Sequence, residues 1–254
     1  MATQNLYYRT CFDRPDLFQK ALLGYFLAFS SWPRLLLEVF IRKNLGERYF
    51  SLSTAIMLII LLALLPMGAI FIPEQLSDEF VSLSSFNRWT WYLYLTTFFL
   101  VCLKRQAEIK RLPSVFDFAR FTRSTGTIHP WFYSLNIGGK FADVRTIETW
   151  LEPGFFFLLG AILWILDQHI GLLFMVCSVF YAMSYRAQYY RGDHFVMDKI
   201  DEMICNEEMV AIFVEGRNSN ETRGVPFYGR RPADSEARRK LVDSFMEEEI
   251  VEAM

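Results

Sequence analysis

The stretch LSTAIMLIILLALLPMGAIFI, residues 52–72, decides the fold class of this chain. It lies within 25 consecutive uncharged residues between Arg48 and Glu74. A helix of about 20 apolar residues crosses the hydrocarbon core of a bilayer. The stretch therefore predicts a transmembrane helix, in keeping with a chain that is 53% hydrophobic and contains 25 phenylalanines.

Three further apolar stretches predict three more spans. Residues 87–104 contain only 15 consecutive uncharged positions, but the two flanking cations can reach towards the headgroups and lengthen the span. Residues 150–166 and 170–186 are separated by the polar triplet DQH (167–169). A polar triplet at mid-bilayer is costly, so this pair predicts a tight transmembrane hairpin. The alternative for this pair is a long hairpin in the core of a soluble domain.

The N-terminal region 14–45 is predicted to form two helices at the cytosolic membrane interface, with a break near Ser31 and Pro33. Arg34 and Glu38 would lie well inside a span over this region, where charge is expensive. The interfacial arrangement is therefore favoured. A fifth span within the same region is the alternative.

The distribution of lysine and arginine predicts which side each loop occupies. If residues 74–87 and 167–169 face one side, 25 of the 26 lysines and arginines fall on the other: seven in 1–51, eight in 104–149 and ten in 186–254. The positive-inside rule places this second side in the cytosol. We therefore predict a multi-pass protein of the cell (inner or plasma) membrane with four crossings and both termini cytosolic.

The predicted organisation is all-α, with five parts along the chain. They are cytosolic or interfacial amphipathic helices (1–51), a first transmembrane hairpin (52–103), a basic and aromatic cytosolic loop (104–149), a second transmembrane hairpin (150–186) and a cytosolic helical tail (187–254). Tryptophans near the span ends are expected to anchor the chain at the two interfaces. These anchors are Trp89, Trp91, Trp150 and Trp164.

The cytosolic loop begins with cations that are expected to contact anionic lipid headgroups, each contributing about 1 kcal/mol near the surface. They are Lys104, Arg105, Lys110, Arg111, Arg120 and Arg123. The alternative is a solvated helix that extends the second span. Further on, a turn-rich segment carries Trp131, Phe132 and Tyr133, and is expected to pack on the membrane or on a neighbouring chain.

The sequence of the tail, 187–254, predicts two amphipathic helices. The first covers 193–209, with Asp193 as its N-cap and apolar residues that include Val196, Ile200 and Met203. The run 209–214 suits either a strand or a continuation of that helix, and 215–232 is typical of a flexible link. A last helix begins at Asp234 or Ser235 and is expected to dock on a partner or a neighbouring subunit. Its contact residues are Leu241, Val242, Phe245 and Ile250.

The sequence contains none of the common catalytic or metal-binding motifs. Its only histidines are His129, His169 and His194, and no HExxH, CxxC, GxSxG or P-loop pattern occurs. Arg123 and His129 have the spacing of some helical ribonucleases, but Gly126 and Pro130 would break the helix that such a site needs. We predict no catalytic, cofactor-binding or metal-binding residues, no cofactor and no nucleic-acid partner.

These observations favour a non-enzymatic membrane subunit that anchors or scaffolds a cytosolic assembly of the secretion, conjugation or defence type. Its expected partners are the bilayer and other protein subunits, and homo-oligomerisation is left open. The first alternative is a homo-oligomeric pore or membrane-disrupting effector, because a hydrophobic constriction can gate without charged rings. The second is a lipid-modifying enzyme. Ion-coupled transport is disfavoured, because no ionisable residue lies near the middle of any of the four predicted spans.

Overall fold

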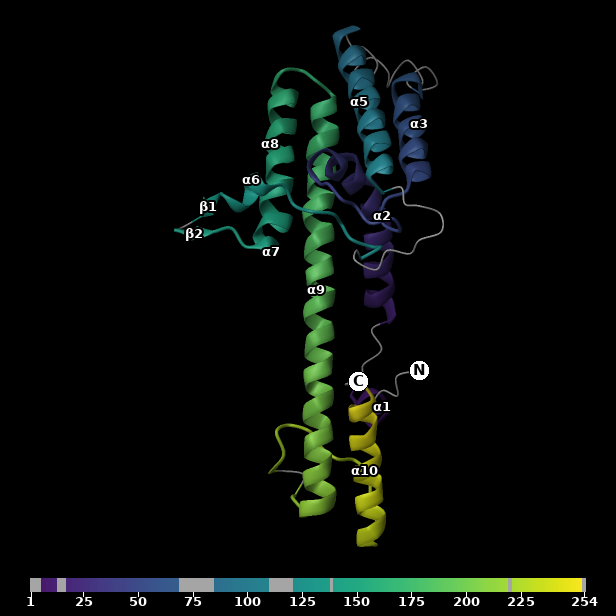
Figure 1. The fold of residues 1–254 in the computed structure, drawn as a ribbon, viewed down its shortest axis with the longest axis vertical. Helices are drawn as coiled ribbons and strands as arrows, with labels where there is room; N and C mark the ends of the chain where they lie inside the picture. Colours follow the sequence, from purple (N-terminus) through teal and green to yellow (C-terminus); the bar gives the residue numbers. More distant parts are fainter. Residues whose placement is uncertain are drawn as a thin grey trace. The chain divides into compact units, whose positions relative to one another are not determined.

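A computed structural model describes residues 6–12, 17–68, 85–109, 121–137, 139–218 and 221–252. The described chain is helical, which confirms the all-α part of the predicted fold class (Figure 1). The helices are α1 (Leu6–Cys11), α2 (Leu17–Ile41), α3 (Leu52–Gly68), α5 (Ser85–Ile109), α6 (Pro130–Tyr133), α7 (Val144–Thr146), α8 (Glu152–Ile165), α9 (Ile170–Val210) and α10 (Ser235–Glu252). Within these residues the only sheet is a two-residue ladder of β1 (Asn136–Ile137) and β2 (Lys140–Phe141).

The chain divides into two compact units. Residues 21–189 form one, which we call the bundle unit, and residues 1–20 with 190–254 form the other, which we call the terminal unit. Helix α9 begins in the first and ends in the second without a break. Each unit has its own apolar core, so each is described by itself.

Helix α2 corrects the prediction of two helices at 14–45. It is one helix that runs through Pro33, with Ser30 and Ser31 hydroxyls donating to the carbonyls of Leu27 and Ala28. The part of α2 that follows Pro33 is packed into the bundle unit, with Leu37 and five neighbours almost fully buried. This burial holds the second half in a helical path, so the proline does not end the helix.

Helices α3 and α5 lie side by side in the bundle unit (Figure 1). Buried residues recur at helical spacing on both helices, for example Ala55, Leu58 and Leu62 on α3, and Leu95 and Phe98 on α5. The first predicted span, 52–72, is helical as far as residue 68, and its last residues lie outside the described part. The second, 87–104, is confirmed as a helix that extends to residue 109.

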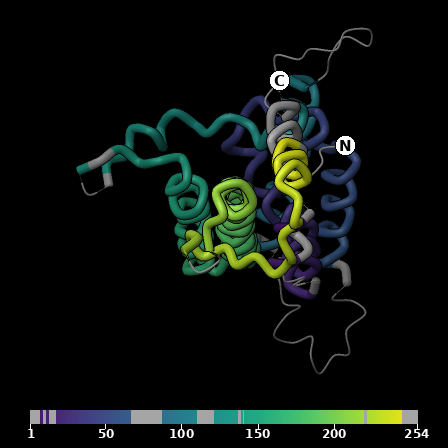
Figure 2. The backbone as a smooth tube through the Cα atoms, turned by 90° about the horizontal axis from the view of Figure 1, so that it is seen from below, coloured from purple at the N-terminus to yellow at the C-terminus, as the bar shows by residue number. Residues whose placement is uncertain are grey.

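Helices α8 and α9 form the hairpin expected around the DQH triplet, and Figure 2 shows them side by side. Their backbones touch at two glycines: a Cβ on Gly160 would lie 2.7 Å from the Gly171 carbonyl oxygen, and one on Gly171 would lie 2.4 Å from that of Gly160. In the turn, Asp167 has a φ of 60° and its carbonyl accepts from Asn87 Nδ2 at 2.9 Å. Aspartate tolerates this left-handed conformation better than most residues, which suits it to the turn.

The length of α9 differs from the prediction. Residues 170–186 and 193–209 were expected as separate helices with Asp193 as a cap, whereas α9 is continuous from Ile170 to Val210 and Asp193 lies inside it. The residues between the two predicted helices, AQYYRG (187–192), include no proline and only one glycine, so nothing in the backbone stops the helix there. The run 209–214 continues this helix through a π-helical turn, Ala211–Glu215.

Two described stretches are long and apolar enough to cross a membrane: Val144–Ile165, which contains α8, and Ile170–Glu215, which contains α9. Leu52–Pro66 in α3 is apolar but shorter. The chain is thus compatible with a membrane protein, while the four-span arrangement and its orientation stay predictions.

Helix α6 and strands β1 and β2 project to the side of α8 (Figures 1 and 2). A small cluster of Ile128, Phe132, Ala142 and Ile147 holds their base. Phe132 was expected to contact the membrane or a neighbouring chain, but only 4% of its surface is exposed. The bundle unit itself covers this side chain. Trp131 on the same short helix, α6, is exposed.

The terminal unit has a separate core around the C-terminal end of α9. Cys205, Met209 and Phe213 pack there against Val242 of α10. Helix α10 begins as predicted, with Asp234 accepting from the backbone N–H of Glu236 at 3.1 Å. The expected flexible link, 215–232, contributes side chains to this core, because the Phe227 ring packs on that of Phe213 at 5.0 Å.

The glycine contact between α8 and α9 generates a prediction. Gly160→Ala and Gly171→Ala should each lower the free energy of unfolding by about 1–3 kcal/mol, because the added methyl group meets backbone atoms that cannot move aside. Gly154→Ala, on the same α8, is the matched control, since its Cβ would meet nothing within 4 Å. Denaturant unfolding of the three variants in one detergent measures the difference. Equal stability of Gly160→Ala and Gly154→Ala would contradict the close approach.

Candidate functional site

A buried polar cluster at the centre of the bundle unit is built from three helical stripes with a spacing of four residues. Arg34, Glu38 and Arg42 follow one face from α2 into the residue after it, and all three are at least 97% buried. Glu148 and Glu152 lie on the π-helical turn Ile147–Leu151 and the start of α8. Residues four apart share a helix face, so each stripe points one way. The third stripe consists of Tyr181, Tyr185 and Tyr189 on α9.

Arg42 joins the three stripes. Its Nη2 lies 2.5 Å from Glu152 Oε2 and its Nη1 lies 3.0 Å from Glu148 Oε1. Tyr181 donates to the same Glu152 oxygen at 2.5 Å, and the Arg42 guanidinium lies over the Tyr185 ring, 4.7 Å from its centroid. Arg42 and Glu152 are both completely buried, so the pair links the end of α2 to α8 without contact with solvent.

A second set of contacts surrounds Glu38. Its two carboxylate oxygens accept from Tyr49 at 2.5 Å and from Tyr185 at 2.6 Å, and Arg34 Nε lies 3.4 Å away. Arg34 also donates to Ser184 Oγ at 2.9 Å. Burial and the neighbouring Glu38 carboxylate hold the pKa of Tyr49 well above its ordinary range, so this phenol keeps its proton and donates.

The cluster is suited to a structural role. Its guanidinium groups and carboxylates are paired with one another, and each tyrosine hydroxyl in it donates to a carboxylate. A small cavity of about 130 Å³ borders the cluster at Tyr49, and its other lining residues are Ser31, Trp32, Leu35, Ser51 and Thr54. Among the residues that the structure describes, no group of three or more His, Cys, Asp or Glu is placed to hold a metal ion.

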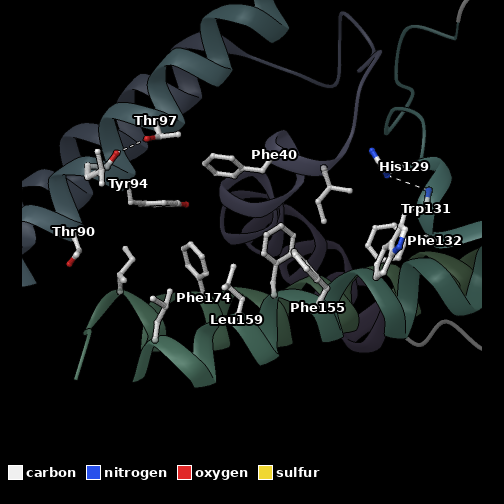
Figure 3. A pocket seen from close by; sticks show the side chains of 15 residues that line it. Phe40, Thr90, Tyr94, Thr97, His129, Trp131, Phe132, Phe155, Leu159 and Phe174 are labelled. Carbon is white, nitrogen blue, oxygen red and sulfur yellow. Dashed lines mark hydrogen bonds between the residues drawn. The ribbon is translucent and has the colours of Figure 1, made fainter. Parts of the chain in front are cut away.

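An apolar cavity of about 640 Å³ opens on the side of the bundle unit, and we call it the aromatic groove. Figure 3 shows it between α5 on one side and α8 and α9 on the other, with Thr90 at one end and His129, Trp131 and Phe132 at the other. Seven of its fifteen lining residues are aromatic rings of Phe, Tyr or Trp. These rings are Phe40, Tyr94, Trp131, Phe132, Phe155, Phe156 and Phe174.

The polar atoms along the walls of the groove already have partners. Thr97 Oγ1 donates to the Leu93 carbonyl at 2.8 Å, and Tyr94 OH donates to the Leu36 carbonyl at 2.9 Å. Thr90 Oγ1 lies 2.7 Å from Gln168 Oε1. The walls therefore present a hydrocarbon surface, apart from the His129 imidazole at one end of the groove.

An exposed apolar stripe lies on α9 within the terminal unit. Phe195, Val196, Met197, Ile200 and Met203 are each 49–65% exposed. Val196, Ile200 and Met203 follow one another at i, i+4 and i+7 and so share a face. This part of α9 has the amphipathic pattern that the sequence predicted, and the described chain leaves it uncovered.

The cations predicted to contact the membrane surface divide into three groups. Lys104 and Arg123 are exposed, whereas Lys110, Arg111 and Arg120 lie outside the described residues. Arg105 differs from the expectation because only 5% of it is exposed. Its Nε donates to the Val39 carbonyl at 3.1 Å and its Nη1 contacts Glu108 at 2.9 Å. This side chain connects α5 to α2 instead of extending outwards.

The predicted interfacial tryptophans are mostly exposed. Trp89, Trp150 and Trp164 have 48–77% of their surface exposed, and Trp150 lies under the Arg186 guanidinium at 4.2 Å. Trp91 is half-buried and its Nε1 donates to the Leu62 carbonyl at 2.9 Å. Their role at the membrane interfaces stays a prediction.

The predicted partner residues of α10 are only in part described. Val242 is buried and Leu241 partly buried in the core of the terminal unit, so the chain itself covers them. The side chains of Phe245 and Ile250 lie outside the described part. Docking of this helix on another protein stays a prediction.

Comparison with known protein families, curated proteins and solved structures finds no match to this chain.

The Arg42–Glu152 contact generates a second prediction. Arg42→Met should lower the free energy of unfolding by about 3–5 kcal/mol, because it leaves the Glu152 carboxylate buried without its counter-charge. Denaturant unfolding in detergent measures the change. The double variant Arg42→Met/Glu152→Leu should be more stable than Arg42→Met alone, since neither charge then remains.

Lys240→Met provides the control for loss of a cation. Lys240 pairs with Glu236 at 2.9 Å, but both side chains are about three-quarters exposed, at 75% and 74%. Its loss should change stability by less than about 1 kcal/mol. If Arg42→Met and Lys240→Met lowered the free energy of unfolding equally, the structural role of Arg42 would be ruled out.

Proposed function

We propose that this protein is a non-enzymatic subunit of the cell membrane that anchors a cytosolic protein assembly, of the type found in secretion, conjugation or defence systems. The observation that carries the proposal is the uncovered length of α9. Residues 190–198 of this helix are exposed at every position, and the apolar stripe continues to Met203. A single helix without packing neighbours is marginal in water, because most helical stability in proteins comes from burial of an amphipathic face.

The charge pattern along α9 supports this assignment. Its first half, up to Tyr185, contains no Asp, Glu, Lys or Arg, whereas the residues from Arg186 onwards mix charges with the apolar stripe. An uncharged segment of this kind suits the hydrocarbon core, and an amphipathic segment suits a water-exposed protein contact. One continuous helix would thus serve as the membrane anchor and as the binding surface for a partner.

The polar groups of the two described sites are largely engaged with other groups of the chain. In the buried polar cluster Arg42 pairs with Glu148 and Glu152, and in the aromatic groove the Tyr94 and Thr97 hydroxyls donate to backbone carbonyls. The apolar stripe on α9 is the described surface that is available for contact with another protein. Exposed apolar surface of this kind commonly marks a site of protein contact.

The partner-binding role is tested by a single substitution in the stripe. Ile200→Glu should reduce the proteins that co-purify stoichiometrically with the tagged chain at least tenfold, because a charge would be buried in the interface. His194→Glu is the matched control: it adds a charge to an exposed site of the same helix, about 120° around the axis from Ile200 by its spacing of six residues. Quantitative mass spectrometry of the detergent-purified chain provides the measurement.

Other outcomes of this experiment would overturn the proposal. Undiminished co-purification with Ile200→Glu would show that the stripe is not the contact. If the chain instead formed a large homo-oligomer and its induction depolarised cells, the alternative function as a homo-oligomeric pore would be supported. Both variants should retain the thermal stability of the parent chain, since neither position is buried.

The predicted orientation is tested by cysteine labelling. With Cys11, the exposed native cysteine, replaced by serine, Asp78→Cys should react with a membrane-impermeant maleimide added outside intact cells. Ala233→Cys should react only after the membrane is permeabilised. Labelling of position 233 in intact cells would exclude the cytosolic location of the tail.

A further inference from the structure

The aromatic groove has the size and surface of a ligand site that the anchor function does not use. Its volume of about 640 Å³ lies within the roughly 300–1,000 Å³ of small-molecule sites. Because the hydroxyls of Thr90, Tyr94 and Thr97 already have partners, the walls of the groove offer a ligand mainly apolar contacts. A ligand held along these walls therefore has a hydrocarbon body.

The direction of the groove suits an extended hydrocarbon chain. It follows α8 from Phe155 to Leu163, a span of eight residue steps that rise about 12 Å at about 1.5 Å each. One leaflet of a bilayer is about 15 Å deep, half of the ~30 Å hydrocarbon core. A neighbouring helix, about 10 Å in diameter, would occupy roughly 900 Å³ over the same length and exceed the cavity.

The groove opens sideways, so its ligand can come from the surrounding bilayer. Several lining residues are substantially exposed: Leu93 at 66%, Trp131 at 52% and Leu159 at 36%. Leu159 belongs to α8, which lies in one of the two stretches apolar enough to cross a membrane. The medium next to this opening is then the acyl chains of lipids.

One end of the groove is polar. The Trp131 backbone N–H donates to His129 Nδ1 at 3.3 Å, so neutral His129 carries its proton on Nε2 and can donate to a ligand oxygen. Thr127, two residues earlier, donates from its backbone N–H to the Lys43 carbonyl at 2.8 Å, which brings an exposed lysine to the same loop. None of the lining residues is acidic. This end therefore favours an anionic group.

We propose that the aromatic groove binds one acyl chain of an anionic membrane phospholipid, with the headgroup beside His129. The amphipathic ring of Trp131 lies at the same end, as tryptophans do at the level of lipid headgroups. Phe155, Phe156 and Phe174 contact the hydrocarbon body from α8 and α9.

Native mass spectrometry tests the proposal with the full-length chain. The chain is reconstituted in vesicles of equal parts phosphatidylglycerol and phosphatidylcholine, extracted in mild detergent and analysed for retained lipid. We expect one phosphatidylglycerol per chain. Leu159→Trp and Leu93→Trp, which fill the groove from α8 and from α5, should each lower the lipid-bound fraction at least fivefold.

The controls are exposed leucines on the same two helices that do not line the groove. Leu158 is 65% exposed and Leu100 is 59% exposed. Leu158→Trp and Leu100→Trp should retain the lipid as the parent chain does. Equal lipid retention by the lining variants and the control variants would overturn the proposal. A second outcome would also overturn it: a parent chain that is dimeric and holds no lipid, and that becomes monomeric when the groove is filled.

His129→Ala tests the headgroup end separately. This variant should lower the lipid-bound fraction at least threefold, because it removes the donor to the phosphate oxygen. An unchanged lipid-bound fraction would overturn the placement of the headgroup. Retained lipid and co-purified protein are independent measurements, so failure here is distinguishable from failure of the anchor function.

Discussion

The buried contact between Arg42 and Glu152 is the constraint on which the bundle unit depends. It joins residues that are 110 positions apart in the chain, and both side chains are completely removed from solvent. Charges in such a place are tolerated only when paired, so the end of α2, the start of α8 and the middle of α9 must meet in one arrangement. Tyr181 and Tyr185 complete that arrangement, because their hydroxyls and rings surround the two charges. A misaligned packing of these helices would leave at least one charge without a partner.

This constraint also explains the position of the aromatic groove. The polar cluster fixes α2 against α8 and α9, while α5 is held to α2 by Arg105 and by the Tyr94 hydroxyl. Mostly aromatic and aliphatic side chains line the space between α5 and α8, and the Tyr94 ring of α5 lies 5.2 Å from the Phe174 ring of α9. A cavity can persist there because the helices on either side are held elsewhere, by polar contacts and by the glycine contact between Gly160 and Gly171. The groove is therefore a consequence of rigid neighbours, as a preformed ligand site requires.

Local features of the fold could be predicted from the sequence, and long-range ones could not. The DQH triplet predicted the α8–α9 turn, and Asp234 predicted the start of α10, because each depends on a few adjacent residues. The single helix through Pro33 was missed, since its second half is held by tertiary burial that outweighs the local signal of a break. Arg34 and Glu38 were assigned to the interface because their partners, Ser184 and Tyr185, lie about 150 positions away. The four-residue spacing of the arginine and tyrosine stripes was the signal that could have indicated a common buried face. The aromatic groove has no comparable signal, because its walls come from separate segments.

The continuity of α9 has a mechanical consequence. An α-helix is stiff about its axis, since each turn is hydrogen-bonded to the next. Within the bundle unit, Tyr181, Tyr185 and Tyr189 therefore keep their positions relative to one another on one face of α9. A rotation of this part of the helix would move all three hydroxyls away from their carboxylate partners at the same time.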